Sequence, residues 1–284
     1  MNKKLPNPGV VEGAPRQMIS PSRDKHTPLS ILMYHQVGRF NNPREHRAVY
    51  CDVGKFRRQM AYLKYSGHQV ISMQCAYRGL FLGAPLPPRP VVLTFDDGYE
   101  NFRQQAWPIL QQLGYPATVY LVTDLIGRSA EWLAPDQQAP LMDSITIRQL
   151  HADGVSFGSH TCSHSRLSQL PEHKQRREII DSKHKLEDLF GEAVTEFCYP
   201  FGDYNLKTRD IVEEAGYATA LTCIRGAANT AANPFEVPRK AISYGDSLLG
   251  FFWKLEVKHA RKDKSSHNPE HIIQGCYDKE KGCN

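Results

Sequence analysis

The sequence predicts a single-domain α/β protein built on a closed, parallel (β/α) barrel. The main observation is that strand-like and helix-like segments alternate along most of the chain, at a spacing typical of βαβ units. The strand-like segments, given below, are numerous enough to close a barrel. The chain has 284 residues, of which 40% are hydrophobic and 23% are charged, so one large domain with a sizeable core is expected.

Short apolar segments predict the strands, and longer amphipathic segments predict the helices between them. The first helix, for example, has Phe56, Met60 and Leu63 on one face and stops at Gly67. Strands are expected at residues 29–34, 69–71, 90–95, 117–122, 155–159, 195–199, 217–222 and 237–242. Helices are expected at residues 54–66, 100–113, 146–152, 171–190, 205–215 and 246–260.

The two ends of the chain differ in composition from its middle. Residues 1–27 are rich in Pro, Gly, Ser and charge, which predicts a disordered basic arm. Residues 261–284 are polar and predict a loose C-terminal tail. We therefore expect the folded domain over residues 28–260, with a polar, turn-rich loop at residues 38–52.

Charge and cysteine content exclude several classes of protein. A formal net charge of +5 is too mild for a nucleic-acid-binding surface, so no nucleic-acid partner is expected. The seven cysteines form no C-x-x-C pair, and their scattered positions favour free thiols in a reducing compartment.

The N-terminal residues lack the apolar segment of a secretory signal, and no run of about 18 apolar residues could span a membrane. A cytoplasmic protein is therefore expected.

One segment near the C-terminus leaves a membrane contact open. Residues 248–255 combine Leu, Phe and Trp with a basic flank, which is typical of a segment at a membrane surface. The same pattern fits a last helix that packs on the barrel. The alternatives are therefore a peripheral contact at the inner membrane and ordinary packing.

Two short segments carry residues that together could bind a metal ion. Thr94–Gly98 (TFDDG) follows an apolar strand and holds two carboxylates, and His160–His164 (HTCSH) follows another short strand. Two imidazoles and one carboxylate form a three-ligand set for zinc that leaves a position for water. The remaining acid could accept a proton from this water. The two segments predict a metal-assisted hydrolase.

Each of these segments has a simpler interpretation when it is taken alone. Asp-Asp-Gly after a strand is compatible with an ordinary turn. The spacing His-x-x-x-His also occurs at His267 and His271 in the polar tail, which lack a preceding strand and a carboxylate partner and are interpreted as surface residues. The distinguishing features of His160 and His164 are the strand before them and the Thr/Cys/Ser-rich loop between them.

A third segment, residues 197–205 (FCYPFGDYN), ends a strand with a Pro-aromatic-Gly turn. Such a turn can point a backbone N–H group toward a developing oxyanion. The alternative is an ordinary turn of an αβ barrel in which Asn205 caps the next helix.

Over residues 29–245 the three segments resemble the polysaccharide deacetylases, the NodB-homology group of carbohydrate esterase family 4. The family's motifs read T-F-D-D-G, H-[ST]-x-x-H and P-[YF]-G, and all three occur in this chain in the family's order. The resemblance implies a distorted (β/α) barrel of the NodB-homology type.

The resemblance also implies roles for individual residues. Asp97, His160 and His164 would hold a divalent metal, most often zinc, although cobalt, nickel and manganese also suit such ligands. Asp96 would be the general base that activates the attacking water, and the backbone N–H of Phe201 would stabilise the oxyanion. Two further residues flank this turn and could line the sugar groove or pack in the core, namely Tyr199 and Tyr204. Thr94 would help to orient the site.

The chain departs from the family pattern at the start of the third motif. Many relatives have an arginine there that braces the catalytic base, whereas this chain has Cys198. Arg239, on a strand expected to end near the same rim, could replace it and keep the carboxylate of Asp96 ionised. The alternative for Arg239 is a surface charge.

A second departure is the absence of the family's late Leu-x-His motif, which supplies the general acid. The segment Met33-Tyr34-His35 instead resembles the opening element of a subgroup, the poly-N-acetylglucosamine deacetylases, whose rearranged barrel takes the acid from an early strand. His35 would then protonate the departing amine, a role that suits a side chain with a pKa near neutrality. The alternative is a structural histidine.

The reaction implied by the resemblance is metal-dependent removal of an acetyl group from an N-acetylated amino sugar. The expected substrate is a bacterial envelope glycan or a lipid-linked glycan precursor. Two alternatives stay open: an O-acetyl esterase acting on a glycan, and a glycan-binding module without catalysis. The spare carboxylate of Asp96 argues against the binding module, because binding alone does not need it.

Overall fold

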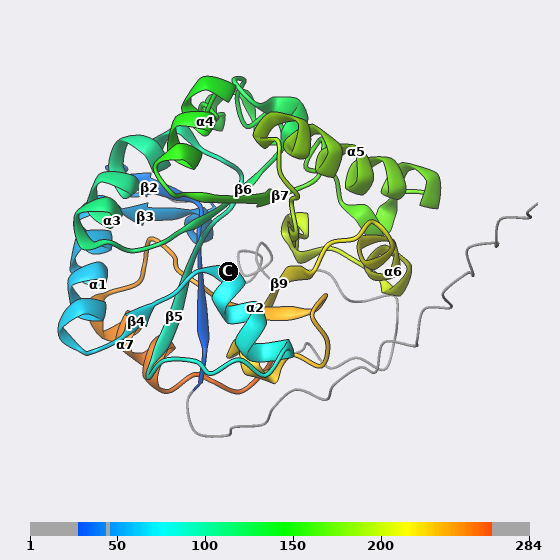
Figure 1. The fold of residues 1–284 in the computed structure, drawn as a ribbon. Helices are drawn as coiled ribbons and strands as arrows, with labels where there is room; N and C mark the ends of the chain where they lie inside the picture. The colour runs from blue at the N-terminus through cyan, green and yellow to red at the C-terminus, as the bar shows by residue number, and fades with distance from the viewer. Residues whose placement is uncertain (1–27, 44–45, 263–284) are drawn as a thin grey trace, which may run out of the picture.

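The computed structural model describes residues 28–43 and 46–262, and its strands close into a parallel barrel (Figure 1). Each strand of the ring pairs in parallel with the next, and the last pairs back to the first. In ring order the strands are β1 (Ser30–Tyr34), β10 (Val237–Ala241), β9 (Thr219–Arg225), β8 (Glu196–Cys198), β7 (Ser156–Ser159), β6 (Thr118–Leu121) and β5 (Pro90–Phe95). The predicted (β/α) barrel is confirmed.

One of the expected strands lies outside the closed ring. β4 (Gln69–Val70) pairs with Pro90 and Val91 at the start of β5, whereas β6 pairs with Thr94 and Phe95 at its end. Because β1 pairs along most of the length of β5, β4 and β6 share the opposite edge of that strand. β4 therefore extends the sheet without helping to close it.

In the described part of the chain, six helices surround the ring and bury its outer face (Figure 1). Outward-pointing strand residues such as Leu32, Leu93 and Val119 belong to one hydrophobic cluster with helix residues such as Met60 and Leu186. These helices are α1 (Val53–Tyr65), α3 (Trp107–Leu113, entered through a π-helical turn at Phe102–Ala106), α4 (Ser144–Ala152), α5 (Glu172–Phe190), α6 (Leu206–Glu214) and α7 (Leu248–Glu256). Each corresponds to a helix expected from the sequence.

A seventh helix, α2 (Met73–Phe81), was not expected from the sequence and closes the bottom of the barrel. Its Met73 and Leu80 side chains join a cluster with inward-pointing residues near the N-terminal ends of the strands, such as Ile31 and Val237. In Figure 1, α2 lies near the centre of the ring. Gly79 sits inside this helix because a Cβ atom there would come within 2.4 Å of the Leu86 side chain.

The expected loop at residues 38–52 contains more structure than its polar composition indicates. β2 (Gln36–Gly38) pairs in parallel with β3 (Tyr50–Asp52) in a small separate sheet. Short 3₁₀ helices occur here and in other connections, at Arg47–Val49, Thr123–Leu125, Pro135–Gln137, Leu167–Gln169, Pro200–Gly202 and Ala228–Thr230. The first of them carries the chain over the C-terminal rim of the barrel.

Several expectations concern residues that the structure does not describe. The arm at residues 1–27, all but the first two residues of the tail at 261–284, and the pair His267 and His271 lie outside the described residues. Within residues 28–43 and 46–262, no helix is both long enough and apolar enough to cross a bilayer.

Candidate active site

Residues at the C-terminal ends of the barrel strands converge on one pocket, as is usual for enzymes with this fold. His35 follows β1, Asp96 and Asp97 follow β5, and His160 follows β7. The pocket has a volume of about 400 Å³, including its open mouth. Its walls are formed by Met33, His35, Ala48, Val49, Asp96, Asp97, His160, His164, Phe201 and Cys223.

Asp97, His160 and His164 form a buried group whose free atoms face one another. The Nε2 atoms of both histidines lie 3.3 Å from the same oxygen of Asp97, Oδ1. This oxygen is buried and has no hydrogen-bond partner in the structure. A buried carboxylate oxygen without a donor is costly unless it has another partner. The three side chains fit a divalent metal, which prefers such a set of carboxylate and imidazole ligands.

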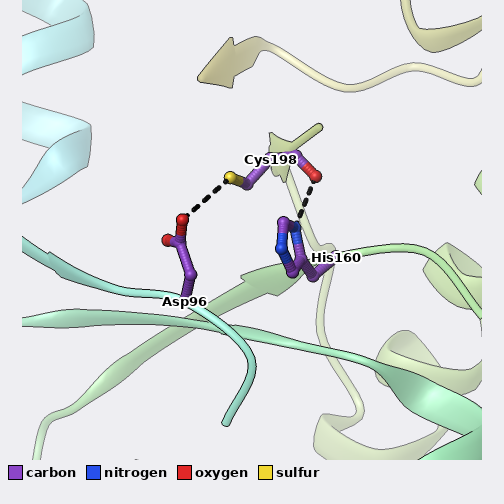
Figure 2. Close-up of side chains that lie close together, drawn as sticks. All are labelled: Asp96, His160 and Cys198. Atoms are coloured by element: carbon purple, nitrogen blue, oxygen red, sulfur yellow. Dashed lines mark hydrogen bonds between the residues drawn. The ribbon is translucent and has the colours of Figure 1, made fainter. Parts of the chain in front are cut away.

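The two imidazoles are held in different ways. The Nδ1 atom of His160 lies 2.7 Å from the backbone oxygen of Cys198, to which it donates (Figure 2). This hydrogen bond orients the ring so that Nε2 faces Asp97 and is the nitrogen available to a metal. His164 has no hydrogen bond at Nδ1 and is packed by rings instead. Its ring centroid lies 4.1 Å from that of Trp132 and 4.5 Å from that of Phe201.

Asp96 forms a doubly hydrogen-bonded ion pair with Arg239. The two nitrogen–oxygen distances are both 2.7 Å, and the arginine is completely buried. The guanidinium also donates to the hydroxyl of Thr94 at 3.1 Å and to the backbone oxygen of Thr222 at 3.0 Å. Burial opposes ionisation of Asp96, but the charge and hydrogen bonds of Arg239, together with two neighbouring histidines, outweigh it. The pKa of this carboxyl therefore lies below its ordinary value. Arg239 is therefore buried against Asp96 and is not a surface charge.

Cys198 lies between the two halves of the site. Its thiol points toward Asp96 and its backbone carbonyl toward His160, as Figure 2 shows. Asp96, His160 and Cys198 are also close enough together to be considered as metal ligands. However, the Arg239 guanidinium lies 3.0 Å from the sulfur, and burial raises the pKa of the thiol. A second cation is therefore disfavoured there, and the group around Asp97 is the better metal site.

Three residues of the site have backbone conformations that L-amino acids seldom adopt. The φ angles are 76° at Asp97, 61° at His164 and 59° at Phe201. Each such residue costs on the order of 1–3 kcal/mol and is tolerated where surrounding contacts fix it, often at functional sites. With these backbone conformations, the side chains of Asp97, His164 and Phe201 all line the pocket.

His35 lies close to the same carboxylate as the buried arginine. Its Nε2 atom is 3.9 Å from Oδ2 of Asp96, and its side chain is partly exposed at the pocket wall. The Nδ1 atom of this ring is buried without a hydrogen-bond partner. The predicted location at the rim is thus observed.

The two tyrosines of the third motif do not line the pocket. Tyr199 is fully buried, and its hydroxyl donates to the backbone oxygen of Phe235 at 3.1 Å. Tyr204 stacks on it with ring centroids 4.5 Å apart and donates to Glu236. Both belong to the hydrophobic core, so the packing alternative holds and the groove-lining expectation is corrected.

Several residues around the site were not identified from the sequence. Trp132 comes from a loop with no recognisable motif, although a lone tryptophan in a polar loop is a signal that could have been noted. Ala48 and Val49 reach the pocket because the expected loop folds over the rim. Cys198 was noted only as a departure, whereas its carbonyl orients His160.

The fold and the site together define a (β/α)-barrel hydrolase, and comparisons with known proteins agree. The family model described as "Polysaccharide deacetylase" matches residues 83–220. The protein YxkH of Bacillus subtilis (strain 168), named for the same family, is 30% identical over 228 residues, which cover 80% of this chain and 76% of YxkH. The chain belongs to the polysaccharide deacetylase family.

Two further relatives extend the comparison. The poly-beta-1,6-N-acetyl-D-glucosamine N-deacetylase of Escherichia coli (strain K12) is 26% identical over 80% of this chain, but this chain spans only 38% of that protein. The structure of the Streptococcus pyogenes deacetylase PplD in complex with acetate is similar with a TM-score of 0.70 and 28% identity. That similarity covers 81% of this chain and all of PplD.

Proposed function

We propose that the protein is a metal-dependent N-deacetylase that removes acetyl groups from N-acetylated amino sugars of a glycan. The observation that carries this proposal is the buried Oδ1 atom of Asp97, which lacks a donor and lies 3.3 Å from both histidine Nε2 atoms. The E. coli relative is named as an N-deacetylase of poly-beta-1,6-N-acetyl-D-glucosamine, which supports the substrate class.

In this proposal Asp97, His160 and His164 hold a divalent metal, with zinc as the first candidate. Cobalt, nickel and manganese also suit this set of ligands. A divalent ion supplies Lewis acidity, which makes water a stronger nucleophile and polarises a carbonyl group. His35 and Phe201 are partly exposed residues of the pocket wall, and the acetyl group is assigned to the space beside them.

Asp96 accepts the proton of the attacking water. The paired arginine keeps this carboxylate ionised, and its two hydrogen bonds fix the plane of the carboxylate. The Oδ2 atom also lies 3.6 Å from the Cys198 sulfur and 3.9 Å from Nε2 of His35. A fixed, ionised acceptor is what a general base needs.

His35 donates a proton to the amide nitrogen as the carbon–nitrogen bond breaks. Acetate and a free amine are then released, and the proton taken by Asp96 balances the proton given by His35. The backbone N–H of Phe201, in a left-handed turn against His164, is assigned to the developing oxyanion. No side-chain nucleophile is needed in this scheme.

The experiment that tests this function compares acetate release from paired oligosaccharides that carry either N-acetyl or O-acetyl groups. We expect release from the N-acetylated glucosamine oligomer by the parent protein and none by the Asp96→Asn variant. Release from the O-acetylated partner alone would indicate an esterase. Binding of the oligomer without any release would indicate a glycan-binding module.

We further propose that α7 brings the protein to an anionic membrane surface, which would suit a lipid-linked glycan precursor as substrate. Leu249, Trp253 and Val257 recur at four-residue intervals along α7 and its C-terminal end, and they are 74%, 50% and 46% exposed. Lys258 and Lys262 follow directly and are exposed, which gives the apolar ridge a basic flank. An apolar ridge with basic neighbours suits an interface with anionic lipid.

A further inference from the structure

The loop that joins the two candidate metal-binding histidines is irregular and strained. Between His160 and His164 the chain makes no helix or strand. Thr161 and His164 both have left-handed backbone conformations, with φ angles of 69° and 61°. A loop of this shape keeps both imidazoles on one ion only if contacts from outside the loop stabilise it.

Glu178 lies on helix α5, outside the pocket lining, and accepts hydrogen bonds from the middle of this loop. Its Oε2 atom accepts from the backbone N–H groups of Cys162 and Ser163, both at 2.9 Å. Its Oε1 atom accepts from the hydroxyl of Ser163 at 2.7 Å. One carboxylate thus holds two adjacent N–H groups and a hydroxyl of the same turn.

The carbonyl groups of the loop are fixed from the opposite side. The backbone N–H groups of Thr123 and Asp124 donate to the carbonyl oxygens of Thr161 and Cys162, at 3.1 Å and 2.9 Å. These donors begin the 3₁₀ helix Thr123–Leu125, which starts two residues after the end of the barrel strand β6. The loop is therefore held between the barrel on one side and Glu178 on the other.

We propose that Glu178 is a positioning residue that sets the affinity of the site for its metal. The proposal rests on the proposed function, because it takes Asp97, His160 and His164 as the ligands. Glu178 does not line the pocket. It acts through the loop, since hydrogen bonds from N–H groups to a carboxylate are stronger than those to a neutral acceptor. Groups that orient metal ligands typically change metal affinity about 10- to 100-fold when they are removed.

The test is a titration of the metal-free full chain with Zn²⁺, monitored by calorimetry or by competition with a chromophoric chelator. We expect Glu178→Ala to raise the Kd for Zn²⁺ about 10- to 100-fold. Glu178→Gln keeps the size of the side chain and one acceptor oxygen, so its Kd should fall between those of the parent and Glu178→Ala. Asp188→Ala, which removes the same charge from an exposed position on α5, should leave the Kd unchanged.

Circular dichroism and thermal unfolding of the metal-free proteins separate positioning from a general loss of fold. A Kd for Glu178→Ala within twofold of the parent value, in a folded protein, would overturn the proposal. If Glu178→Ala does not fold, Glu178→Gln decides in the same way: a raised Kd supports the proposal and a parental Kd overturns it. A parent protein that binds no Zn²⁺ would instead remove the proposed function itself.

Discussion

Asp96 and Arg239 are 143 residues apart in the chain and form a doubly hydrogen-bonded ion pair inside the barrel, with both nitrogen–oxygen distances at 2.7 Å. Asp96 follows β5, whereas Arg239 lies within β10, with β1 between the two strands. The pairing of β10 with β9 is irregular between Val237 and Arg239. In the irregular part of β9, the carbonyl oxygen of Thr222 accepts a hydrogen bond from the Arg239 guanidinium. The fold therefore delivers a completely buried cation to the carboxylate proposed as the base.

Removing the cation from this pair should destabilise the protein strongly. In Arg239→Met the carboxylate of Asp96 stays buried without its partner, which typically costs about 3–5 kcal/mol of the free energy of unfolding. The double variant Asp96→Asn/Arg239→Met leaves no uncompensated charge and should recover part of this loss. Urea denaturation of the metal-free proteins measures both. A loss below about 1 kcal/mol in the single variant would show that the pair is not buried as described.

Replacing His35 should slow the reaction while leaving metal binding intact. Loss of a general acid typically lowers the turnover number about 10²- to 10⁴-fold. We therefore expect His35→Ala to release acetate from an N-acetylated oligomer at a rate reduced to that extent, with the metal content of the parent. The control is His173→Ala, an exposed histidine on α5. Parental turnover in His35→Ala would exclude His35 from proton transfer.

Glu196 should make stability depend on pH. Its side chain is buried and accepts a hydrogen bond from the Tyr120 hydroxyl at 3.3 Å, and burial raises its pKa from 4.5 to about 7. Between these values the folded protein holds a proton that the unfolded chain has released. The contribution of neutral Glu196 to the free energy of unfolding is therefore fully present below pH 4.5 and is lost as the pH rises through 7. The free energy of unfolding should fall by about 3 kcal/mol across this range.

Glu196→Gln isolates this effect, because the amide stays neutral at every pH. Relative to the variant, the parent should lose stability between pH 4.5 and 8, and the difference should follow one titrating group. Chemical denaturation in the presence of a chelator at several pH values measures it. A difference that does not change with pH would show that Glu196 is ordinarily ionised in the folded protein.

The apolar ridge on α7 should bind anionic vesicles. Replacement of Leu249 and Trp253 by Ser removes most of the exposed apolar area and should weaken co-sedimentation with phosphatidylglycerol vesicles about tenfold or more. Leu206→Ser is a matched control, because Leu206 is a 62% exposed leucine on α6. Binding of the parent to neutral and anionic vesicles alike, or to neither, would contradict the proposed contact.

The strands could be predicted from the sequence because each is a short apolar segment between turn residues. The helices that cover the barrel carry clear amphipathic patterns, as Phe56, Met60 and Leu63 do on α1. α2 was not predicted, although α7 has the same length and also contains a glycine. In α2 the glycine is Gly79, near the C-terminal end, and a glycine normally disfavours a helix. That glycine is explained only by the approach of Leu86, which is a tertiary contact.

The candidate site was partly predictable for a similar reason. Residues that directly follow strands, such as Asp96, Asp97 and His160, can be placed at one rim by topology alone. The direction of Arg239 could not be predicted, because Arg239 and Lys240 are adjacent charged residues and either could have pointed into the barrel. Both side chains are buried in the structure. Arg239 forms its ion pair with Asp96 inside the barrel, whereas Lys240 donates a hydrogen bond to the Ser30 hydroxyl on the outer face. Sequence alternation carries no information in such a case.

The most direct test of the central claim is the amount of divalent metal bound per chain in three purified proteins. The parent and Asp96→Asn should each bind one equivalent, because Asp96 belongs to the arginine pair and not to the metal ligands. Asp97→Ala should bind none under the same conditions, and only the parent should release acetate. One full equivalent of tightly bound metal in Asp97→Ala would contradict the account.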